Sequence, residues 1–223
     1  MNDIMPFVRL DFITLKPYFT IKNLLIFAAA PLILTLYTGN TTISNGIFMT
    51  NAMTYVSYPF ALGDQCNIDA LYISLSISRE TVVRGRYVFA LLFDVCAGLV
   101  SFLYAMLTGV LFGRGSTLQE SILVVTVLCV VFSFFQSIQI PVYFKLGYAK
   151  AKMVANMPFL VLSLFIVLGS RLLGNNSIRY VASLLHWMEA HAILAVLFGL
   201  GLWLAFLYLS YRLSLAYYDK REF

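Results

Sequence analysis

Long apolar runs separated by short charged segments dominate this sequence. Six runs are each long enough to cross the hydrocarbon core of a bilayer, which takes about 20 residues as a helix. They cover residues 21–38, 44–62, 87–112, 121–144, 154–173 and 192–213. A soluble domain is about 45–50% apolar and about 25% charged, whereas this chain of 223 residues is 61% hydrophobic and 11% charged. The sequence therefore predicts an all-α membrane protein with six transmembrane helices.

The distribution of Lys and Arg predicts how these helices are oriented. Twelve of the 15 basic residues lie in or beside the N-terminal segment, residues 63–86, residues 145–153 and the C-terminal segment. The other three, Arg114, Arg171 and Arg179, lie in or beside the remaining connections. Because cytoplasmic segments of membrane proteins carry the excess of Lys and Arg, we expect both termini and both basic connections in the cytoplasm. That arrangement requires an even number of spans.

The segments outside the six runs carry further predictions. Residues 1–20 are expected to form an amphipathic elbow helix on the inner leaflet, with a bend at Pro17, a residue that suits the first turn of a new helix. The apolar face of this helix is expected to contain Phe7, Leu10, Thr14, Leu15 and Tyr18. Ser78 is expected to cap a short helix that leads into the third span, and residues 174–191 to form a small interfacial helix.

The motifs of common catalytic sites are absent from the sequence. It contains no G-x-x-x-x-G-K-[ST], no H-E-x-x-H and no G-x-S-x-G. Residues 186–191 hold two His and one Glu, but structural zinc takes four ligands, so we interpret this segment as a polar outer loop. The three Cys lack paired spacing. We therefore expect no enzyme activity, cofactor or metal in this chain, and no nucleic-acid partner, because its basic residues flank apolar runs instead of forming one patch.

Polar residues inside two of the predicted spans are candidates for a role in transport. Asn51, Thr54 and Tyr58 lie on one helical face of the second span. Polar groups avoid lipid, so this face either packs within the bundle or lines a translocation path or dimer seam. Asp94 is the one acidic residue inside a span. It is either a carboxylate near the inner mouth, paired with an Arg or hydrated, or a proton-coupling site.

Four segments resemble parts of a known transporter family. Residues 59–89 contain Leu75-Ser76-Ile77-Ser78-Arg79-Glu80 followed by Val83-Arg84-Gly85-Arg86-Tyr87. This resembles the L-P-I-S-R-x-x-I-V-x-x-R-Y loop of small six-span ABC-2-type transporter permeases, with Ser76 in place of a common proline. Residues 10–16, 141–152 and 219–223 are similar to the family's elbow, second inner loop and charged tail. The resemblance extends to the permeases of the staphylococcal phenol-soluble modulin exporter.

The resemblance implies a function and a set of partners. The chain would form one permease domain over residues 1–223 in the bacterial plasma membrane, paired with a second copy or a paralogue and surrounded by lipid. A separate ABC ATPase, carrying ATP and Mg, would dock on the elbow and on residues 63–86 and 145–153, and would power export of amphipathic peptides or other hydrophobic compounds. The coupling residues implied are Asp69, Leu71, Tyr72, Ser78, Arg79, Glu80, Arg84, Arg86, Lys145, Tyr148, Lys150 and Lys152.

Two other functions are compatible with a bundle of this kind. The first is a secondary transporter or channel subunit. A secondary carrier is expected to show internal repeats with interrupted helices, and residues 1–112 and 113–223 show no convincing repeat. The second is a membrane enzyme, or a sensory or assembly protein. An enzyme needs catalytic residues gathered at one depth, and none are evident in the sequence.

Overall fold

The computed structural model describes residues 4–39, 41–66, 68–74, 77–112, 117–173 and 191–221. Within these ranges the chain is helical, joined by short turns, and contains no strand. The elements are α1 (Ile4–Leu15), the 3-10 turn η1 (Lys16–Tyr18), α2 (Ile21–Thr38), α3 (Thr41–Cys66), α4 (Ile68–Ser74), α5 (Arg79–Phe112), α6 (Leu118–Leu146), α7 (Tyr148–Leu173) and α9 (Ala192–Asp219). All six predicted runs fall in long helices, namely α2, α3, α5, α6, α7 and α9.

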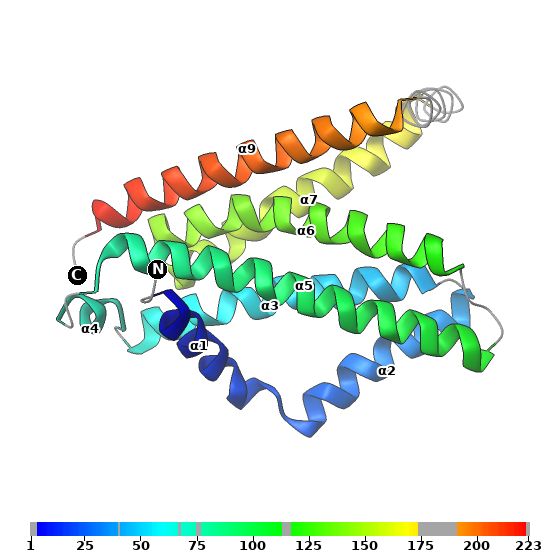
Figure 1. Ribbon diagram of the computed structural model, residues 1–223, viewed down its shortest axis with the longest axis horizontal. Helices are drawn as coiled ribbons and strands as arrows, with labels where there is room; N and C mark the ends of the chain where they lie inside the picture. The colour runs from blue at the N-terminus through cyan, green and yellow to red at the C-terminus, as the bar shows by residue number, and fades with distance from the viewer. Residues whose placement is uncertain are drawn as a thin grey trace.

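The helices form an elongated bundle (Figure 1). Helices α3, α5 and α6 pack against one another, α7 and α9 each pack on α6, and α1 packs on α5 and α3. Helices α1 and α2 meet at an angle on the opposite side from α9 (Figure 1). Both chain ends and α4 lie at one end of the bundle. We call this the charged end and define it by the described residues within 4–15, 59–86, 143–152 and 211–221.

Membrane insertion is indicated by both the length and the surface of the helices. Among the described residues, four helices are long and apolar enough to cross a membrane: Ile21–Thr38, Arg79–Phe112, Leu118–Leu146 and Val196–Asp219. Leu103, Val110 and Phe198 are among the many large apolar side chains that are more than half exposed. A surface of this kind needs a nonaqueous solvent. The molecule is therefore an all-α, multi-pass membrane protein. The second and fifth predicted spans, in α3 and α7, are not among these four helices; α3 is rich in Asn, Ser and Thr.

Local capping interactions explain several helix boundaries. The Ser78 hydroxyl accepts a hydrogen bond from the Thr81 N–H at 3.2 Å, which confirms the predicted cap at the start of α5. Thr117 and Glu120 form a reciprocal capping box at the start of α6. Gly39 follows α2 in the left-handed conformation, and its N–H donates to the Thr35 carbonyl at 2.8 Å.

Three predictions about the connecting segments are refined or corrected. The predicted loop 145–153 is mostly helical, since α6 ends at Leu146 and α7 begins at Tyr148. The helix begun after Ser78 runs without a break to Phe112, through the third span. On α1 the buried face contains Phe7, Val8, Asp11 and Leu15, while Leu10 is exposed. Of the predicted apolar face, Phe7 and Leu15 therefore pack on the bundle, and the elbow helix on the inner leaflet stays a prediction. The predicted helix 174–191 lies outside the described residues, apart from His191.

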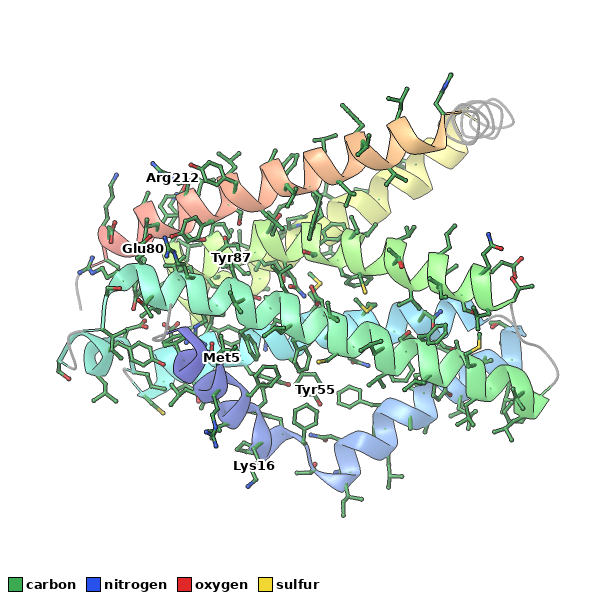
Figure 2. All side chains as sticks on the ribbon, viewed as in Figure 1. Met5, Lys16, Tyr55, Glu80, Tyr87 and Arg212 are labelled. Atoms are coloured by element: carbon green, nitrogen blue, oxygen red, sulfur yellow. The ribbon has the colours of Figure 1, made fainter. Side chains whose placement is uncertain are left out.

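Polar side chains link helices deep in the bundle. The Tyr87 hydroxyl, on α5, is hydrogen-bonded to the hydroxyls of Ser210 and Ser214 on α9. Figure 2 shows Tyr87 between these two helices. Ser101 donates to the side-chain oxygen of Asn45 at 2.8 Å, which joins α5 to α3. Helices in a membrane gain no hydrophobic stabilisation from contacting each other instead of lipid, so such bonds and close packing hold them together.

Candidate functional site

A buried ion pair fixes α1 to the bundle at the charged end. The Arg86 guanidinium on α5 donates to the Asp11 carboxylate on α1 at 2.6 Å, and the two side chains are 4% and 1% exposed. Arg86 also donates to the Pro59 carbonyl on α3 at 3.3 Å. Its guanidinium lies 5.5 Å from the Phe7 ring centroid and 4.9 Å from that of Phe60. One side chain thus joins α1, α3 and α5.

The environment of this pair affects the protonation of Asp11. Burial raises the pKa of the Asp11 carboxyl to about 6, because desolvation outweighs the opposing effect of the Arg86 guanidinium. A buried ion pair is expensive to form and more expensive to break, since removing one partner leaves an uncompensated charge. The pair therefore fixes the position of α1 more than it adds to stability.

The last turn of α3 contacts the first turn of α7 through one carboxylate. Asp64 accepts hydrogen bonds from the backbone N–H groups of Tyr148 and Ala149, the latter at 3.3 Å. These N–H groups have no partner within their own helix, and a negative charge at a helix N-terminus is favourable. Asp64 therefore caps α7 from a neighbouring helix.

The C-terminal segment binds to the same region. Arg221 donates to Asp64 at 3.0 Å and lies 3.7 Å from the Asp69 carboxylate on α4. The Tyr218 hydroxyl donates to the Asp69 carboxylate at 3.1 Å. The end of α9 is thereby joined to α3 and α4.

Arg79 contacts the end of α9 as well. It donates to the backbone carbonyls of Tyr218, at 3.0 Å, and Asp219. The last carbonyls of a helix lack intrahelical partners and carry partial negative charge, so Arg79 caps α9. The resemblance gave Arg79 a role at an ATPase contact, and the structure gives it partners inside the chain.

The other predicted coupling residues divide by exposure. Arg86 and Tyr72 are buried, and both pack against Phe7 of α1. Asp69, Arg79 and Tyr148 are half-buried. Glu80 and Arg84 form a 2.5 Å ion pair with side chains 50% and 53% exposed. The exposed members of the predicted set are Leu71, Ser78, Glu80, Arg84, Lys145, Lys150 and Lys152. Figure 2 shows Glu80 at the same end as Arg212.

A cavity of about 330 Å³ lies between α3, α6 and α7. Thr50, Thr54 and Ser57 line it from α3, and Gln139 and Lys152 line it from α6 and α7. The three hydroxyl residues are spaced four and three apart, which places them on one helical face. Met53, Phe132 and Leu160 add apolar surface. The cavity thus combines hydroxyl groups, one cation and apolar side chains.

The structure separates the three predicted polar residues of α3. Thr54 lines the cavity. Tyr58 instead stacks on Tyr18 of η1, with ring centroids 4.1 Å apart and planes 4° from parallel, so it packs within the chain. Asn51 is half-buried and is not among the residues that line the cavity. The polar stripe is Thr50, Thr54 and Ser57, a repeat that was visible in the sequence.

Asp94 lies buried between α5 and α6. Its carboxylate accepts a hydrogen bond from the Gln136 amide at 2.7 Å. This partner is an amide from the next helix and not an Arg, while hydration of the carboxylate stays a prediction, and Asp94 is not among the residues that line the cavity. A role in proton coupling stays a prediction.

Asp11, Asp64 and Arg221 were missed as site residues. Each lies in a segment that carried the family resemblance, but their partners are 75, 84 and 157 residues away in the chain. One signal in the sequence pointed to Asp11: it lies four residues after Phe7, so it shares a helical face with an apolar residue. Among the residues that the structure describes, no three His, Cys, Asp or Glu side chains are placed to hold a metal ion.

The fold and the charged end together define a multi-pass helical membrane protein with a charged surface at one end. Residues 7–219 match the family model described as ABC-2 family transporter protein, so the chain belongs to that family. It is an ABC transporter permease of the ABC-2 type. No match was found among curated proteins or among solved structures. The narrower resemblance to the phenol-soluble modulin exporter therefore stays a prediction.

Proposed function

We propose that this chain is the six-span permease subunit of an ATP-driven exporter. It moves amphipathic peptides or other hydrophobic compounds out of a bacterial cell and has both termini in the cytoplasm. The observation that carries the proposal is α5, which runs unbroken from the exposed Glu80–Arg84 pair at the charged end to Phe112. A helix of this kind transmits displacement at its first turn into the membrane.

The energy is proposed to come from a separate ABC ATPase that holds ATP and Mg. The sequence has no phosphate-binding loop. At the charged end, exposed side chains project from α4, from the first turns of α5 and from the α6–α7 junction; Leu71, Glu80, Arg84, Lys145 and Lys150 are examples. These elements are joined by the contacts of Asp64, Asp69, Arg79 and Arg221. A force that the partner applies to one of these elements is therefore transmitted to the others.

A second permease, either a copy or a paralogue, is proposed to cover part of the bundle. Four described helices meet the criterion for a membrane span, and α3 and α7 complete a set of six in this proposal. Helix α3 has the polar face of Thr50, Thr54 and Ser57, which is poorly suited to lipid. Pairing shields this face and places the cavity beside the path of the substrate.

Transport into inverted vesicles tests this function. Vesicles from cells that overproduce the chain together with its ABC ATPase are supplied with a fluorescent amphipathic helical peptide. ATP is expected to drive its uptake, and ADP is not. Uptake that follows an imposed proton gradient and ignores ATP would support the alternative, a secondary transporter, and overturn the proposal. A variant of the ATPase that binds ATP without hydrolysing it is the control for energy coupling.

A further inference from the structure

Helices α3 and α7, which both line the cavity, are hydrogen-bonded to each other through Asp64. Helix α3 supplies Thr54 and Ser57 to the cavity, and α7 supplies Tyr148 and Lys152. At the charged end, Asp64 in the last turns of α3 accepts hydrogen bonds from the Tyr148 and Ala149 N–H groups, which begin α7. One carboxylate therefore bonds the end of α3 to the start of α7.

Gly147 makes this contact possible. It adopts φ +72°, a conformation that favours glycine. A Cβ atom there would lie 2.8 Å from a carboxylate oxygen of Asp64 and 3.1 Å from a guanidinium nitrogen of Arg221. Only a residue without a side chain lets Asp64 and Arg221 approach the start of α7 together.

Arg221 holds Asp64 from the other side. It bonds to Asp64 at 3.0 Å and lies 3.7 Å from Asp69, with 30% of its own side chain exposed. Two residues earlier, the Asp219 carbonyl accepts a hydrogen bond from Arg79, at the start of α5. The tail after α9 therefore connects the first turn of α5, an element proposed to receive force from the ATPase, to the carboxylate between α3 and α7.

We propose that Asp64 and Arg221 are positioning residues that form a joint, and that this joint sets the separation of α3 and α7 and so the opening of the cavity. Arg221 holds the Asp64 carboxylate in place, and Asp64 holds the start of α7. Release of Arg221 lets α7 move away from α3. The consequence for transport rests on the proposed function, but the geometry of the joint does not and is tested on the permease alone.

Cysteine accessibility in the cavity measures the opening. The natural Cys66, Cys96 and Cys129 are replaced by Ala, and Ser57→Cys places one thiol on the cavity wall. Its reaction rate with a small cationic methanethiosulfonate is measured in native membranes. Arg221→Gln and Asp64→Asn are expected to raise the rate about fivefold, the change expected from loss of a partly exposed ion pair. Asp64→Asn keeps an oxygen that accepts the α7 N–H bonds, so this variant isolates the loss of charge.

Matched variants separate the joint from general loosening. Arg221→Lys keeps the charge and is expected to restore the original rate, and Lys220→Gln, at the adjacent exposed residue, is expected to leave it unchanged. Gly147→Ala is expected to raise the rate by displacing Asp64. Rates equal to the unmodified protein in Arg221→Gln and Asp64→Asn would overturn the proposal, and so would a rise of the same size in Lys220→Gln.

The role in transport has its own readout. With the ATPase present, Arg221→Gln is expected to hydrolyse ATP at the original rate and to transport several times less peptide per ATP, with Arg221→Lys restoring the ratio. Arg221→Gln could raise the labelling rate of Ser57→Cys and still transport the original amount of peptide per ATP. That result would overturn the role of the joint in coupling. Loss of ATP-driven uptake in the unmodified protein would instead count against the proposed function and leave the labelling result standing.

Discussion

Arg86 carries its charge in one of the least exposed positions of the molecule, between the rings of Phe7 and Phe60. A guanidinium suits this site because its planar fork donates in several directions and stacks on aromatic faces. Here it reaches the Asp11 carboxylate and the Pro59 carbonyl at once. Because the Arg86 charge is buried, loss of its partner Asp11 is expected to destabilise the protein strongly.

Asp11→Ala is expected to destabilise the protein by about 3–5 kcal/mol, because the charge of Arg86 stays buried without its partner. The double variant Asp11→Leu, Arg86→Met removes both charges and is expected to be much less destabilised. Thermal unfolding in lipid nanodiscs provides the measurement, with Arg9→Ala as the control on the exposed side of α1. If Asp11→Ala and the double variant unfold at the same temperature, the ion pair does not hold α1 in place.

The pKa of Asp11 gives this site a defined pH dependence. Burial raises that pKa from 3.8 to about 6, so the folded protein holds the proton more tightly than the unfolded chain. The stability contributed by this carboxyl is therefore fully present below about pH 4 and is lost as the pH rises through about 6. We expect the melting temperature of the native protein, relative to Asp11→Asn, to fall between about pH 4 and pH 6. A difference that does not change over this range would contradict the assignment.

Helices α5 and α9 are joined by both hydrophobic and polar contacts. Tyr87 bonds to two serines of α9, and Arg79 caps the last turn of the same helix. The first turns of α5 therefore move with the end of α9. The capping pattern at Ser78 correctly indicated a helix that leads into the third span, but it carried no information about α9 as a neighbour.

Arg79→Ala is expected to loosen the last turn of α9, since its carbonyls lose a cationic donor. Interactions of this kind contribute about 0.3–1 kcal/mol, so amide hydrogen exchange around residues 215–219 is expected to speed up severalfold while the rest of the helix is unaffected. Lys220→Ala is the comparison, because it removes a nearby exposed charge. Equal exchange in the two variants would show that Arg79 is not the cap.

The cavity lies between helices α3, α6 and α7. Thr54→Leu fills part of it and is expected to lower peptide uptake severalfold without reducing the amount of protein in the membrane, because a more apolar residue inserts at least as readily. Thr126→Leu is the matched control, since Thr126 is exposed on α6 and its hydroxyl bonds to the Ile122 carbonyl of its own helix. Normal uptake by Thr54→Leu would exclude the cavity from the transport path.

For the whole molecule, the sequence predicted the kind of elements better than their partners. Apolar runs identified all six long helices, since hydropathy and length act locally. They could not show that α1 turns Asp11 inward, that the 145–153 segment is almost entirely helical, or that Arg221 lies beside Asp64. Each of these depends on residues far apart in the sequence. The cavity was predicted only in part. Thr54 was identified as a candidate for the translocation path, but Thr50 and Ser57, which line the cavity with it, were not.

The orientation of the molecule in the membrane is the remaining prediction at this scale. The excess of Lys and Arg at the charged end predicts that this end faces the cytoplasm. In a protein without its natural cysteines, Thr117→Cys is expected to react with a membrane-impermeant maleimide on intact cells. Ala149→Cys is expected to react only after the cells are permeabilised. Both residues are exposed in the structure, so a difference between them reports sidedness and not burial.

Lys220→Cys should behave like Ala149→Cys, because the two lie at the same end of the bundle. Labelling of Ala149→Cys on intact cells would reverse the orientation, and the charged end would then be out of reach of a cytoplasmic ATPase.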